Sequence, residues 1–97
     1  MKLRLGFSNY NIKKTTGLIE HGCFGSFDAD NKVITIDPEQ VEETREQTLW
    51  HEVIHGILYE MEEKEIYKDE EFVNMLAKMV HRFLKDNSLE KVYASLR

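Results

Sequence analysis

The sequence predicts an α+β fold, in which a small antiparallel sheet is followed by helices packed on one of its faces. Two observations lead to this prediction. Residues 2–37 contain segments that alternate apolar and polar side chains, whereas the later residues carry apolar side chains at helical spacing. Strands first and helices second is the order of a layered α+β domain. A chain of 97 residues is expected to form one domain over residues 1–97.

The predicted sheet has three strands. Residues 2–12 alternate as a half-buried strand does, with a break at Ser8. Residues 23–37 have the pattern of a β-hairpin, with a turn over residues 28–31. The β-branched run at residues 33–36 is the strongest strand signal in the chain.

Two helices are predicted after the sheet. Asp37 is a good N-cap and Pro38 suits the first helical position, so the first helix should begin there and end near residues 60–65. The second should run over residues 69–84, with a short terminal helix over 89–96. We expect the apolar side of each helix to be buried. In the first helix this side comprises Trp50, Val53, Ile54, Ile57, Leu58 and Met61, and in the second Phe72, Val73, Leu76, Ala77, Met79, Val80, Phe83 and Leu84.

The charge pattern disfavours some classes of partner. Thirteen Lys and Arg stand against eighteen Asp and Glu, which gives a net charge of -5. The basic residues are scattered singly, so neither nucleic-acid binding nor binding to an anionic membrane surface is expected. No apolar run approaches the ~20 residues that span a bilayer. With one cysteine, Cys23, and no signal-peptide pattern in the first 17 residues, a cytoplasmic location is expected.

The motif His-Glu-x-x-His lies in the middle of the predicted first helix, at His51, Glu52 and His55. Residues four apart are neighbours on a helix, so both imidazoles can reach one metal ion. Glu52 projects about 100° away from His51 and can address a water on that metal. Nitrogen ligands suit zinc, which in catalytic sites takes three protein ligands and keeps one position open. The motif therefore predicts a Zn²⁺ site with Glu52 as the catalytic base.

A third ligand must come from downstream. Glu70 is favoured because it lies at the edge of the apolar arc of the second helix, whereas Glu71 points to solvent. His81 is eleven residues further on, about 16 Å along the helix, and cannot share a metal with Glu70. It is more simply interpreted as a hydrogen-bonded or solvent-edge histidine. The candidates considered were Glu60, Glu62, Glu63, Glu65, Glu70, Glu71 and His81.

Three further side chains have alternative interpretations. Asn74 lies one turn after Glu70 and could hold a ligand in place, or it could be an ordinary polar group on a helix face. Tyr59 lies one turn after His55 and is a weak candidate for stabilising an oxyanion, against a packing or surface role. Cys23 could ligate zinc, but a free cysteine is more often a small buried apolar side chain.

The sequence resembles the gluzincin-type zinc metallopeptidases, and more closely the ImmA/IrrE family of intracellular metallopeptidase domains from bacteria, phages and mobile elements. The resemblance covers about residues 22–80 and rests on the strand at 32–37, the segment TLWHEVIHGI at 48–57 and the segment EEFVNMLA at 70–77. It implies a minimal zincin-like fold. It also implies that Glu70 is the third ligand beside the two histidines, with a protein or peptide as substrate.

We therefore expect zinc-dependent hydrolysis of peptide bonds. If the strand at 32–36 lies at the sheet edge, it could bind an extended peptide by strand addition. Two alternatives remain open. One is a zinc-binding but non-catalytic interaction module, such as an anti-repressor or antitoxin-like partner. The other is a small α+β scaffold without metal. The sequence does not indicate an oligomeric state.

Overall fold

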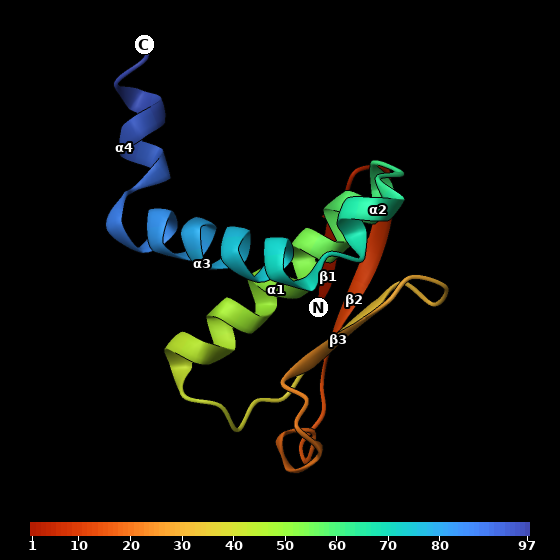
Figure 1. The fold of residues 1–97 in the computed structure, drawn as a ribbon. Coiled ribbons are helices and arrows are strands. Elements are labelled where there is room, and N and C mark those ends of the chain that lie inside the picture. The colour runs from red at the N-terminus through yellow and green to blue at the C-terminus, as the bar shows by residue number, and fades with distance from the viewer.

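A computed structural model describes all 97 residues and confirms the α+β class (Figure 1). Four strands form one sheet in the order β1-β2-β4-β3, and the long helices follow them in the chain. The strands are β1 (Lys2–Leu5), β2 (Ser8–Lys14), β3 (Gly25–Asp28) and β4 (Val33–Ile36). The helices are the 3-10 turn η1 (Ile19–His21), α1 (Glu42–Glu60), α2 (Lys64–Tyr67), α3 (Glu70–Asp86) and α4 (Leu89–Ala94).

The sheet has one more strand than predicted, and it is mixed rather than antiparallel. The first predicted strand is a hairpin, because the chain turns at Gly6, whose φ of 59° lies in the left-handed region that glycine tolerates. β2 then pairs parallel with β4, with Ile12 opposite Ile34. As a result β4 lies inside the sheet, and the edge strand beside it is β3. The strand at 32–36 is therefore not an edge strand.

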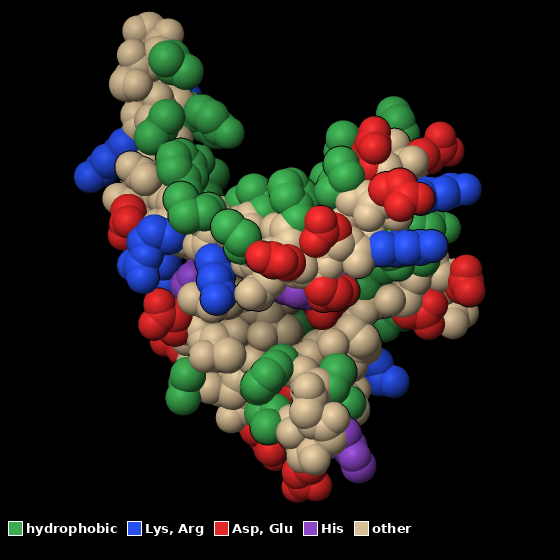
Figure 2. Space-filling view, in the orientation of Figure 1, with side chains coloured by type: hydrophobic (Ala, Val, Ile, Leu, Met, Phe, Trp, Pro, Cys, Tyr) green, Lys and Arg blue, Asp and Glu red, His purple; other side chains and the backbone are tan.

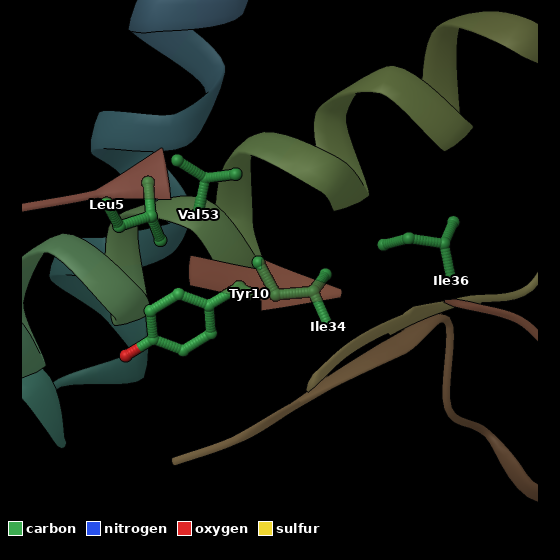
Figure 3. Close-up of a cluster of buried hydrophobic side chains, with 5 residues drawn as sticks. All are labelled: Leu5, Tyr10, Ile34, Ile36 and Val53. Carbon is green, nitrogen blue, oxygen red and sulfur yellow. The ribbon is translucent and has the colours of Figure 1, made fainter. Parts of the chain in front are cut away.

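α1 covers one face of the sheet, and the larger core lies between them. Val53 of α1 points toward the strands, where it meets side chains from β1, β2 and β4 (Figure 3). Fully burying an aliphatic side chain of this kind contributes about 1.5–3 kcal/mol. The buried residues of this cluster are Leu5, Tyr10, Ile34, Ile36 and Val53.

α1 begins at Glu42, four residues later than the first helical position predicted at Pro38. Asp37 is fully buried and serves another segment: its carboxylate accepts hydrogen bonds from the backbone N–H groups of Leu18, Ile19 and Glu39. These bonds hold the pKa of Asp37 below its usual range. The side chain therefore fixes the loop after β2 instead of capping the helix.

α3 begins where the sequence placed it, but it packs against α1 and not on the face of the sheet where the second helix was predicted. The side chain of Asp69 accepts a hydrogen bond from the backbone N–H of Phe72, as an N-cap does. Val73 and Ala77 of α3 are buried against Ile54 and Leu58 of α1. None of the helices is both long and apolar enough to cross a membrane.

The predicted burial of the two apolar helix faces is wrong for several residues. The sheet and α3 cover only part of α1, and α3 packs mainly against α1 and α2, so the outer side of both helix faces is open to solvent. α4 projects from the end of α3 away from the sheet, and all of its residues are exposed (Figure 1). The exposed members of the predicted faces are Ile57, Met61, Phe72, Leu76, Met79 and Phe83.

Candidate metal centre

Three predicted ligands meet in space, two from α1 and one from the first residue of α3. Nε2 of His51 lies 3.0 Å from Oε2 of Glu70, and Nε2 of His55 lies 3.0 Å from Oε1 of the same carboxylate. The two Nε2 atoms are 3.2 Å apart. His51 and His55 lie one helical turn apart, and the turn that ends α2 brings α3 back across them.

The spacing of these atoms suits a zinc ion. Ligands at about 2.0–2.1 Å from a tetrahedral zinc lie about 3.3 Å from one another. The two Nε2 atoms are 3.2 Å apart, and each lies 3.0 Å from a different oxygen of the Glu70 carboxylate. Two imidazoles with one carboxylate form a donor set that zinc accepts. The side chain of Glu70 is 69% exposed, so the cluster is open to solvent on one side. The residues present thus fit a zinc ion with a free fourth position.

A backbone group that sequence reasoning missed sets the orientation of His55. Its Nδ1 lies 2.9 Å from the carbonyl oxygen of Tyr67, at the end of α2. A carbonyl can only accept, so Nδ1 carries the hydrogen and donates it, which leaves the Nε2 lone pair facing Glu70. Burial lowers the pKa of His55, which favours the neutral ring that metal binding needs. A backbone carbonyl has no signature in the sequence.

Glu52 is buried beside the cluster and lines the same cavity as the ligands. Burial, with a smaller contribution from the charge of Glu70, raises the pKa of Glu52 to about 7. Neighbouring helix residues are rotated by about 100°, so Glu52 leaves α1 at a different angle from His51 yet still reaches this cavity.

The cavity holds about 680 Å³ and runs between α1, α3 and the edge strand β3. Gly25 allows β3 to come close to α1, because a Cβ there would lie 2.8 Å from the carbonyl oxygen of Thr35 and 2.8 Å from Cγ2 of Thr48. Asn74 lines the cavity, as its predicted position near Glu70 requires. Cys23 also lines it, and its thiol donates to the carbonyl of Gly25.

Other candidate residues lie elsewhere. Tyr59 is outside this cavity and packs its ring 6.0 Å from that of Phe27, so the structure does not bring it to the ligands. The carboxylate of Glu60 accepts hydrogen bonds from Tyr10 and Ser8. His81 is buried and paired with Glu46 through Nε2 at 2.9 Å. Of the downstream candidates, Glu70 alone joins the histidines.

Comparisons with known proteins add nothing to this picture. No protein-family model, curated protein or solved structure matches the chain. The function is therefore argued from the geometry of the site.

Proposed function

We propose that the protein is a zinc-dependent peptidase of minimal zincin-like form, in which His51, His55 and Glu70 hold the metal and Glu52 is the catalytic base. One observation supports this most strongly. Three ligand atoms from two helices converge at zinc-compatible spacing, on the wall of a cavity that a buried carboxylate also lines. The proposal agrees with the resemblance of the motif segments to the ImmA/IrrE family. A cytoplasmic location is part of it, since Cys23 has no partner for a disulfide.

In this proposal the zinc ion and the protein side chains have different roles in hydrolysis. A zinc ion bound at the site would supply a Lewis acid that polarises a carbonyl and acidifies water. Glu52 takes the proton of the attacking water and passes it to the leaving amine. The carbonyl of Tyr67 keeps the ring of His55 in the tautomer and orientation that the ligand role requires.

The edge strand β3 is the feature that could hold an extended peptide beside the ligands. It pairs with β4 on one side only, and its residues Gly25, Ser26 and Phe27 line the cavity together with both histidines. Strand addition at such an edge gives affinity through main-chain hydrogen bonds and requires little sequence preference. Peptide binding by strand addition is therefore proposed for β3 and not for the strand at 32–36, which lies inside the sheet.

The variant Glu52→Gln tests the proposal. Hydrolysis of fluorogenic peptides by the zinc-loaded protein should fall about 10²- to 10⁴-fold, because the proton acceptor is lost. Zinc content should stay unchanged, because Glu52 is not a ligand. Glu71→Gln is the matched control: this exposed glutamate next to Glu70 should be replaceable without loss of activity or zinc. Equal activity in Glu52→Gln and wild type would overturn the assignment.

The second candidate is a zinc-binding interaction module that does not cleave. The exposed apolar side of α3 favours it, because such a surface is typical of binding proteins. A module of this kind would bind zinc, show no peptide hydrolysis and be indifferent to Glu52→Gln. The same experiment therefore separates the two candidates.

A further inference from the structure

α3 carries two apolar stripes, of which only one is covered. The inner stripe, at Val73 and Ala77, is buried against α1. The outer stripe consists of Phe72, Leu76, Met79 and Phe83, which are 43%, 37%, 68% and 50% exposed. Its spacing of four, three and four residues is the a/d spacing of a helix that packs along another helix. No charged residue interrupts it.

The outer stripe belongs to a larger apolar surface. At one end of α3 it is followed by the exposed apolar side chains of the C-terminal segment, and at the other end by those of α1 and α2. Figure 2 shows hydrophobic side chains along a concave surface that extends from the projecting α4, over α3, toward the α2 end. Exposed apolar residues of the neighbouring elements include Leu89, Val92, Tyr93 and Leu96 in and after α4, and Ile57, Met61 and Ile66 in and near α1 and α2.

The chain exposes more surface than a compact monomer of its mass. The chain has 7086 Å² of accessible surface, whereas compact monomers of 11.5 kDa have about 5,800 Å². This excess of about 1,300 Å² belongs to the chain as a whole, and it is larger than the ~800 Å² that one partner contributes to a standard interface.

We propose that this surface is the interface of a homodimer in which two copies of α3 pack antiparallel through their outer stripes. A two-fold axis midway between Leu76 and Met79 places Leu76 opposite Met79 of the partner subunit. It also places Phe72 opposite Phe83 of the partner subunit. Such a contact is self-complementary, as a two-fold interface requires.

The arrangement of charge favours a second copy in this orientation. The N-cap and first turn of α3 carry the acidic residues Asp69, Glu70 and Glu71, whereas its second half carries Lys78, Arg82 and Lys85 and one acidic residue, Asp86. Antiparallel packing brings the acidic end of one copy beside the basic half of the other and opposes the two helix dipoles. A parallel pair would place like charges together.

The position of α4 also favours an antiparallel dimer. α4 leaves the C-terminal end of α3, while α2 and the end of α1 lie at its N-terminal end (Figure 1). In an antiparallel dimer these opposite ends become neighbours across the axis. The apolar side of α4 then lies over the apolar residues of α1 and α2 in the partner subunit. Each subunit thus covers exposed apolar side chains at both ends of the other.

The molar mass of the full-length protein in solution tests the proposal. Light scattering at micromolar concentration should give twice the 11.5 kDa chain mass. The double variant Leu76→Glu/Met79→Glu should raise the dimer dissociation constant by at least about 100-fold, because it buries charge at the centre of the contact. Both positions are exposed in the single chain, so circular dichroism should show a retained fold. Val41→Glu, at an exposed apolar residue before α1, is the control and should remain dimeric.

A wild-type chain that is monomeric at the highest attainable concentration would overturn the proposal, and an unrelated partner would then be the occupant. Disulfide cross-linking tests the orientation in a Cys23→Ser background. A mixture of Phe72→Cys and Phe83→Cys chains should cross-link, whereas Phe72→Cys alone should not. The reverse result would overturn the antiparallel arrangement. Neither measurement depends on zinc or on hydrolysis.

Discussion

The two halves of the molecule are buried to very different degrees. The half made of the sheet and α1 has a core of five buried apolar residues, in which Tyr10 and Ile34 are completely covered. The half made of α3 and α4 contributes only Val73, Ala77 and His81 to the interior, all from α3. The first half thus holds itself together, while the second depends on its packing against α1.

The proposed metal centre lies where these halves meet. His51 and His55 belong to the well-packed half, whereas Glu70 begins the poorly covered helix. A metal at this site would therefore bind the two halves to each other as well as supplying chemistry. Because unfolding would destroy the site, its binding free energy would add to the stability of the fold.

The largest expected effect comes from a cavity in the well-packed half. Ile34→Ala should lower the free energy of unfolding by about 2–5 kcal/mol, because the side chain is fully buried. Val92→Ala in α4 removes an exposed side chain and should change it by less than about 0.5 kcal/mol. Urea unfolding of dilute, zinc-free protein, followed by Trp50 fluorescence, measures both. Equal losses would contradict the contrast between the halves.

A smaller effect on stability is expected from the ion pairs between α1 and α3. The carboxylate of Glu46 lies 2.9 Å from Nε2 of His81 and 3.1 Å from Nζ of Lys85, and these partners hold its pKa below the ordinary 4.5. A lowered pKa in the fold stabilises it above pH 4.5, and this contribution disappears as the pH falls through the lowered value. Wild type should therefore be more stable than Glu46→Gln at neutral pH.

The difference between these two proteins should shrink as the pH falls from 6 to 3. Urea unfolding of the zinc-free proteins across this range measures it, and the comparison removes the contributions of other acidic groups. A difference that stays constant with pH would show that the Glu46 carboxylate does not tie α3 to α1 in this way.

Local signals in the sequence were enough to predict which three side chains lie together at the candidate metal centre. The spacing of His51 and His55 has meaning only on a helix, and the helix is predicted by its own apolar periodicity. Asp69 marks the start of the next helix, and this start sets the face on which Glu70 lies. The helix wheel and the motif resemblance both selected Glu70, and the structure brings that residue to the histidines.

Features that depend on contacts between distant segments were not predictable. Alternation identifies a strand but not its neighbour, so the parallel pairing of β2 with β4 was missed. Asp37 has the residue type and position of a helix cap, yet its carboxylate binds backbone groups 18 and 19 residues earlier. The apolar side of α3 is wider than one neighbouring helix can cover, so periodicity alone overestimated its burial.

Zinc stoichiometry of the purified protein tests the central claim most directly. Wild type should bind one equivalent, and both His55→Ala and Glu70→Ala should lose most of it, while Glu71→Ala at the neighbouring exposed position should keep it. Elemental analysis after dialysis measures all four proteins. Less than about half an equivalent in wild type, unchanged by the two ligand substitutions, would contradict the metal centre and the function proposed from it.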